Sequence, residues 1–185
     1  MKNILKNRLA LSTVVTTLII LVVSVLLAGV VTYFAINVTS TRVQEESLHL
    51  TKQHVWYDGS GAASQAAIMV INTGGRDVVI DKLAVRGQEV AWGNVFVNTT
   101  TDSVSADLTY ITSLNATSSV TLGGTAYDLD ATTTDLTLQS GATMIIYVTS
   151  PDSITINDIG LTVAMTVFTS QAMYYKETNV QAYIT

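Results

Sequence analysis

An uncharged, apolar stretch near the N-terminus limits what this chain can fold into more than any other feature. Residues 9–41 contain no charged side chain, and residues 18–36 are the most apolar part. Nineteen helical residues rise roughly 28 Å, which is about the thickness of the hydrocarbon layer of a membrane. Only Ser24 and Thr32 interrupt this part, and both can bond back to helix carbonyls. The sequence therefore predicts a membrane-spanning helix.

Charge is distributed unevenly around this stretch. Lys2, Lys6 and Arg8 precede it, whereas all fourteen acidic residues of the chain follow Ala10. A basic flank stays on the cytoplasmic side of a membrane, so we expect the rest of the chain to lie outside. The formal net charge is −5 and no basic cluster follows Ala10, which argues against nucleic-acid binding.

Three fates of the apolar stretch are open: a cleaved secretory signal, a plain membrane anchor, or a pilin-type signal whose helix is retained. The stretch is too long for a secretory signal. Beyond Ser40, apolar and small residues recur at spacings of three and four, which predicts that the helix continues to about His54. These residues are Val43, Ser47, Leu48, Leu50, Thr51 and Val55. Such a face must pack against the chain's own outer domain or against neighbouring subunits.

The sequence around Ala10 is Asn-Arg-Leu-Ala-Leu-Ser, at residues 7–12, and the long apolar helix follows it. This arrangement resembles the class III signal peptide of archaeal type IV pilin-like proteins, the adhesion pilins and archaellins. The resemblance implies cleavage after Ala10, with Arg8 as the basic residue near the site and Leu11 as the first mature residue. Leu9 departs from the commonest pattern, in which both residues before the small one are charged. Bacterial type IV pilins usually carry Glu at the fifth mature position, which is Val15 here.

The resemblance implies a domain organisation and a function. Residues 1–10 would be a cleaved leader, residues 11–57 a hydrophobic helix that forms the filament core, and residues 58–185 an extracellular head. The chain would be a pilin that polymerises through its helix into a surface filament for adhesion. Its implied partners are copies of itself, a prepilin peptidase, an assembly ATPase and a membrane platform protein. The precursor would lie in the cell membrane with its N-terminus in the cytoplasm.

Two other functions remain open from the sequence. The chain could be an archaellin of a motility filament, which the same features would fit. It could also belong to another class, a single-pass membrane-anchored extracellular domain that binds a ligand. Within the helix, Ser24, Ala28 and Gly29 form a small-residue patch that would allow close helix approach in a filament. The alternative is that they are ordinary small residues of a membrane span.

The remainder of the chain has the pattern of a β domain. Short runs of β-type residues alternate with turn residues, and no strand–helix alternation occurs. Residues 161–168 alternate at period two, with Leu161, Val163, Met165 and Val167 on one face. We therefore predict an α+β chain with an antiparallel β-sandwich head, Ig-like or pilin-type. The predicted strands are residues 65–72, 77–85, 89–97, 108–111, 120–122, 136–138, 143–149, 161–168, 173–175 and 180–184.

Three Asn-X-Thr triplets could accept N-linked glycans outside the cell. Asn98 and Asn115 lie in apparent loops, and Asn37 lies on the helix near the membrane. The alternative is that these triplets occur by chance in a chain rich in Thr.

An enzyme is not predicted. Cysteine is absent, which excludes a disulfide, a thiolate zinc site and a cysteine nucleophile. His49 and His54 are the two histidines, and their spacing of five does not suit a helical metal pair. We expect both to be solvated residues of the helix, which leaves the head without a base for a Ser-His-Asp triad. We therefore expect no catalytic residues, no metal and no cofactor.

Overall fold

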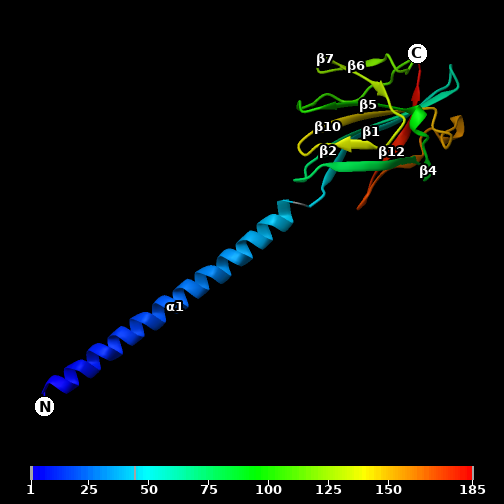
Figure 1. The fold of residues 1–185 in the computed structure, drawn as a ribbon. Helices are drawn as coiled ribbons and strands as arrows, with labels where there is room; N and C mark the ends of the chain where they lie inside the picture. The colour runs from blue at the N-terminus through cyan, green and yellow to red at the C-terminus, as the bar shows by residue number, and fades with distance from the viewer. Residues whose placement is uncertain (1, 44, 185) are drawn as a thin grey trace. The chain divides into compact units, whose positions relative to one another are not determined.

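The computed structural model describes residues 2–43 and 45–184, and of residues 2–10 and 41–43 only the backbone. The chain divides into two compact units, Met1–Val43 and Gln44–Thr185. The first unit is a single helix and the second is almost entirely β (Figure 1). The predicted α+β class, with one apolar N-terminal helix followed by a β domain, is confirmed.

The first unit is helix α1, Lys2–Val43, which runs unbroken over 42 residues (Figure 1). Its segment Leu11–Ser40 contains an 18-residue window with a mean hydropathy of 2.9, and the segment is long and apolar enough to cross a membrane. The hydroxyls of Ser24 and Thr32 donate to carbonyls one turn earlier, at 2.7 Å and 2.8 Å, as the sequence predicted. These polar groups are therefore satisfied inside the helix, as an apolar environment requires.

The prediction that the helix continues to about His54 was wrong. The helix ends at Val43, and strand β1 occupies Leu48–Asp58, so the boundary between the units does not lie at residues 57 and 58. A β-bulge explains the misleading pattern, because the pairing of β1 with its neighbour shifts register between Thr51 and His54. Leu48 and Leu50 precede the bulge and Val55 follows it, yet all three join the same core cluster. The extra residue changes the period-two alternation into spacings that mimic a helix.

Residues 63–183 contain the other strands. They are β2 (Ala63–Asn72), β3 (Val78–Val85), β4 (Gln88–Glu89), β5 (Val95–Thr100), β6 (Ser119–Leu122), β7 (Thr125–Asp128), β8 (Asp130–Ala131), β9 (Leu136–Leu138), β10 (Thr143–Thr149), β11 (Thr162–Thr169) and β12 (Met173–Tyr183). Two short 3₁₀ turns, Trp92–Asn94 and Ile156–Asp158, lie between them.

One sheet contains most of these strands. Its order is β4-β3-β11-β12-β1-β2-β10-β5-β8, with β9 also paired to β3, while β6 and β7 form a separate hairpin. β1 and β12 pair in parallel, with Val55 opposite Val180. The other described pairs are antiparallel, so the predicted antiparallel arrangement fails at this one junction. Because the pair joins the first and last strands of the domain, it links the two halves of the sheet.

Several predicted strand boundaries differ from the structure. Residues 89–97 contain the end of β4, a 3₁₀ turn and the start of β5 rather than one strand. Residues 108–111 form no strand. Residues 173–175 and 180–183 belong to one strand, β12, which ends at Tyr183, one residue before the predicted end. The prediction for residues 161–168 is confirmed at Val163, Met165 and Val167, which are buried on one face of β11. Leu161 precedes the strand and is half exposed.

The sheet curls around a large apolar cluster. Ile68 of β2 and Ile146 of β10 join this cluster from one half of the sheet, and Ile80 of β3 and Val167 of β11 join it from the other. Side chains from both halves share one core, so the sheet closes over it. The structure thus shows a curled, continuous sheet, and it does not confirm the predicted sandwich of two separate sheets.

A second apolar cluster covers the opposite face of β2 and β10. Met69 and Tyr147 point into it from the strands, and Leu108 and Val120 cover them. β2 and β10 are consequently buried on both faces, which explains their nearly continuous apolar sequences. This second face is where the candidate site lies.

Candidate functional site

A long segment without regular structure covers the second cluster. Residues 101–118, here called the covering loop, connect β5 to β6. Leu108 of this loop is only 3% exposed. Loops of this length in a compact domain usually either have a function or are disordered. Side chains of the sheet bond the backbone of the covering loop, and these attachments form the candidate site.

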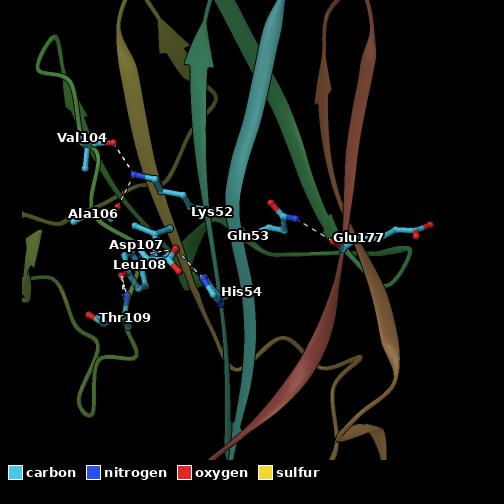
Figure 2. A network of polar contacts seen from close by, with 10 residues as sticks. Lys52, Gln53, His54, Val104, Ala106, Asp107, Leu108, Thr109 and Glu177 are labelled. Carbon is cyan, nitrogen blue, oxygen red and sulfur yellow. Dashed lines mark hydrogen bonds and ion pairs between the residues drawn. The ribbon is translucent and has the colours of Figure 1, made fainter.

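Lys52 makes the first attachment. Its Nζ donates to the carbonyl oxygens of Val104 and Ala106, at 2.6 Å and 2.5 Å (Figure 2). Lys52 lies in the bulge of β1 with a φ of 54°, a left-handed conformation that non-glycine residues rarely adopt. The next residue, Gln53, donates from its amide to the carbonyl of Glu177 in β12 at 3.1 Å. The bulge therefore directs two consecutive side chains to different neighbours of β1.

Gln65 of β2 makes the second attachment. Its amide nitrogen donates to the Ile111 carbonyl at 3.1 Å, and its amide oxygen accepts the Ile111 N–H at 2.9 Å. The side chain thus bonds a backbone as a neighbouring strand would. Because Gln65 is 3% exposed, these bonds also satisfy a buried amide.

Tyr147 of β10 makes the third attachment. Its hydroxyl donates to the Thr109 carbonyl at 2.9 Å and accepts the Thr109 N–H at 3.3 Å. Burial raises the pKa of Tyr147 to about 12, against the lowering effect of its bonds to Thr109. The phenol therefore stays protonated, and able to donate, throughout the physiological pH range.

His54 of β1 and Asp107 of the covering loop lie within ion-pair distance of each other. His54 Nε2 lies 2.9 Å from Asp107 Oδ1 (Figure 2). The imidazole stacks on Trp56, with ring centroids 5.0 Å apart. Burial opposes ionisation of Asp107, but the bond and charge of His54, the Leu108 N–H and the charge of Lys52 outweigh it. The pKa of this carboxyl consequently lies below its usual value.

An aromatic row continues from this pair. Trp56 meets the edge of Tyr110 at 6.1 Å between centroids, and Tyr110 stacks on Tyr183 at 3.9 Å. Burial, and then the charge of Asp58, raise the pKa of Tyr110. One contact is edge-to-face and the other is stacked, and together they join the covering loop to β1 and β12.

The candidate site is a set of side chain–backbone hydrogen bonds, here called the clamp. Side chains from β1, β2 and β10 bond the backbone of the covering loop between Val104 and Ile111. Among the residues whose side chains are described, no group of three His, Cys, Asp or Glu residues is placed to hold a metal ion. The prediction that His49 and His54 lie on the helix was wrong, because both lie in β1. His49 is exposed, as predicted, whereas His54 is held between Asp107 and Trp56.

An ion pair between Arg86 and Asp158 lies elsewhere in the β domain. Arg86 Nη1 donates to Asp158 Oδ1 at 2.6 Å and to the Ser153 carbonyl at 3.2 Å. Hydrogen bonds from Thr155, and then Arg86, hold the pKa of Asp158 below its usual value.

A cavity of about 100 Å³ lies nearby, lined in part by Pro151. Another, of about 250 Å³, lies beside Val104 at the start of the covering loop. Both are smaller than the roughly 300–1,000 Å³ typical of ligand sites.

The predicted helix residues are placed as follows. Arg8 and Ala10 are in α1, but their side chains lie outside the described part, and Leu11 is 67% exposed. The small-residue patch of Ser24, Ala28 and Gly29 is exposed, and a side chain added at Gly29 would meet nothing within 4 Å. Space is therefore available on this side of the isolated helix.

The three predicted glycan acceptors have different surroundings. Asn37 is exposed on α1 and Asn115 is exposed in the covering loop. The prediction that Asn98 lies in a loop was wrong, because Asn98 is half-buried in β5.

Sequence reasoning missed Lys52, Gln65, Asp107 and Tyr147 as members of one site. The residues lie in three strands and a loop, and their contacts span 38 to 54 positions of the chain. A detectable signal was the alternation of Lys52, His54 and Trp56, which share one side of β1 from the bulge onward.

The described part of the chain is thus an apolar N-terminal helix followed by a β domain whose covering loop is clamped to the sheet. No family model and no curated protein matches the sequence. Among solved structures, the ligand binding region of serine-glutamate repeat protein A of Enterococcus faecium is similar at 13% identity and a TM-score of 0.32. That match covers 76% of this chain and 99% of the other.

A family 123 glycoside hydrolase from Clostridium perfringens is similar at 8% identity and a TM-score of 0.34. The match covers 75% of this chain but only 27% of the hydrolase. At these TM-scores neither comparison supports an argument about function.

Proposed function

We propose that this chain is a pilin, a structural subunit of an extracellular filament of the archaeal type IV kind, assembled through α1. The observation that carries the proposal is the character of Leu11–Ser40, a thirty-residue segment without charge, mostly apolar, in which every residue is exposed. At 1.5 Å per residue this segment is about 45 Å long, whereas the hydrocarbon layer is about 30 Å thick. A simple anchor does not need this additional uncharged length.

The apolar residues surround the helix completely. Leu18, Ile19, Ile20 and Leu21 are consecutive, so they point in four directions about 100° apart, and each is at least 54% exposed. A helix that is apolar all round must be surrounded on every side. Lipid provides this environment before assembly, and a bundle of identical helices provides it afterwards.

Polymerisation follows from the same physics. Outside lipid, exposed apolar surface costs about 25 cal/mol per Å². Identical helices that pack side by side remove this cost, and head-to-tail contacts that do not close produce an open filament. The β domain has its own core and would form the outer surface, where adhesion takes place. An archaellin of a motility filament would share each of these features.

A second candidate is a single-pass membrane-anchored extracellular domain that binds a ligand. The clamped covering loop favours it, because binding residues are often on loops that a rigid sheet positions. In this case α1 would remain in the membrane with its N-terminus uncut, and the β domain would act as a monomer.

N-terminal sequencing of the protein sheared from its native cells separates these functions. A start at Leu11 in high-molecular-weight material is the result expected of a pilin. A start at Met1 in the membrane fraction would contradict the pilin and support the anchored domain. A start beyond Ala35 would mean that the apolar helix is removed, which would contradict both.

A further inference from the structure

The three Asn-X-Thr triplets are equivalent in sequence but not in structure. An N-glycan acceptor triplet has a hydroxyl two residues after its asparagine and lies in a surface loop. Only the folded chain reveals whether the hydroxyl can reach its asparagine. The triplets lie in three different settings, a turn at Asn115, a strand at Asn98 and a helix at Asn37.

Asn115 has the geometry that brings the two groups together. Its side-chain oxygen accepts both the Thr117 hydroxyl, at 2.8 Å, and the Thr117 N–H, at 2.9 Å. A turn holds this arrangement, because the Ser118 N–H donates to the Asn115 carbonyl at 3.0 Å. Asn115 and Thr117 are both exposed. The Asn115 amide nitrogen donates to the Ser113 carbonyl at 3.1 Å, which uses one of its two hydrogens.

Asn98 lacks this geometry. It is half-buried in β5, and its amide nitrogen donates to the Asp128 carbonyl at 2.7 Å. The hydroxyl of its partner, Thr100, instead accepts the N–H of Asp102 at 3.0 Å. The extended backbone of a strand keeps the asparagine and threonine side chains apart along one face.

Asn37 is excluded by the helix around it. Residues two apart on a helix do not face each other, so Thr39 points away from Asn37. Asn37 also lies within Leu11–Ser40, the segment that lipid or other helices surround in the proposed function.

We propose that Asn115 is the acceptor of an N-linked glycan and that Asn98 and Asn37 are not. The donor is a lipid-linked sugar phosphate or diphosphate, and a membrane transferase catalyses the reaction. A bond forms between the sugar C1 and Asn115 Nδ2, while the bond from C1 to the phosphate oxygen breaks. The lipid phosphate departs, a base of the transferase takes one amide proton, and no oxidation or reduction occurs. The Thr117 hydroxyl, bonded to the amide oxygen, draws electron density from the nitrogen and favours loss of that proton.

The inference rests on the β domain lying outside the cell, as the proposed function requires. The test expresses the full-length chain in cells whose own surface proteins carry glycans on Asn-X-Thr triplets. Mass spectrometry of its peptides is then compared between the natural chain and N115Q, T117A, T117S and N98Q. We expect a glycan on the peptide that contains Asn115, its loss in N115Q and T117A, and its retention in T117S and in the matched control N98Q. Unchanged denaturation curves of the variants would exclude misfolding as the cause.

A protease added to intact cells separates two kinds of failure. If the β domain is cleaved from outside but Asn115 is bare, or Asn98 carries the glycan instead, the glycan proposal is wrong and the extracellular placement stands. If the β domain is protected from the protease, the placement is wrong, and both proposals fail with it.

Discussion

Helix α1 and strand β2 are built from similar apolar residues, yet their surroundings are opposite. Leu21 and Val25 of α1 are 63% and 64% exposed, whereas Ile68 and Val70 of β2 are at most 1% exposed. β2 is covered on both faces by side chains of the same domain. The β domain thus contains its own apolar environment, while α1 requires one from lipid or from other copies of the chain.

Removing a core side chain from the β domain should produce the largest difference between the two regions. Ile146 is fully buried, so Ile146→Ala should lower the free energy of unfolding by about 2–5 kcal/mol. The matched change Leu21→Ala in α1 should leave unfolding of the β domain within about 0.5 kcal/mol of the natural chain. Denaturation of the full chain in detergent, followed by fluorescence of Trp56 and Trp92, measures both. Equal effects would mean that α1 is part of the same folding unit.

A charge in α1 should impair membrane insertion and leave the stability of the β domain unchanged. Leu21→Lys places an ammonium near the middle of Leu11–Ser40, which disfavours membrane insertion by roughly 2.5–3.5 kcal/mol. We expect less protein in the membrane fraction and an unchanged denaturation curve of the β domain. As a control, Thr121→Lys on an exposed strand position should change neither. Normal insertion of Leu21→Lys would refute the proposal that lipid surrounds this residue.

Loss of the Lys52 clamp should weaken the β domain less than the loss of a core side chain. Lys52→Met leaves the Val104 and Ala106 carbonyls without their charged donor, which should cost roughly 1.5–3 kcal/mol. Limited proteolysis should then cut the covering loop faster. Lys82→Met is the matched control, because the Lys82 Nζ is 4.0 Å from a Glu89 carboxylate and its side chain is 48% exposed, so we expect less than about 1 kcal/mol there.

The smallest expected effect is on the acid dependence of stability. The pKa of Asp107 is lower in the folded chain than the usual value of 3.8, so its ionised form stabilises the fold above about that pH. This contribution is lost as the pH falls below 3.8 through the folded pKa. Asp107→Asn should therefore reduce the slope of stability against pH in this range, while Asp135→Asn, in an exposed loop, serves as the control. An unchanged slope in Asp107→Asn would show that the His54 contact does not favour the carboxylate.

Much of the fold was predictable from local pattern. The apolar span Leu11–Ser40 and the strands β2, β3, β10 and β11 lie where the sequence predicted them, because each has either a continuous apolar run or alternation at period two. β1 was not predictable in this way, because the bulge at Lys52 disrupts its alternation. The covering loop was predicted in part as a strand, since residues 108–111 are apolar, but side chains rather than a strand bond its backbone.

For the candidate sites too, local sequence pattern and tertiary packing determined different features. The sequence by itself determined the apolar span, the β-rich remainder and the positions of the three glycan triplets, because these depend on composition and short spacing. Only the tertiary structure decided that Lys52, Gln65 and Tyr147 hold one loop, and that Asn115 rather than Asn98 has its threonine hydroxyl within reach. Contacts between residues far apart in the chain, and the local backbone of a turn, depend on packing that no short pattern of residues specifies.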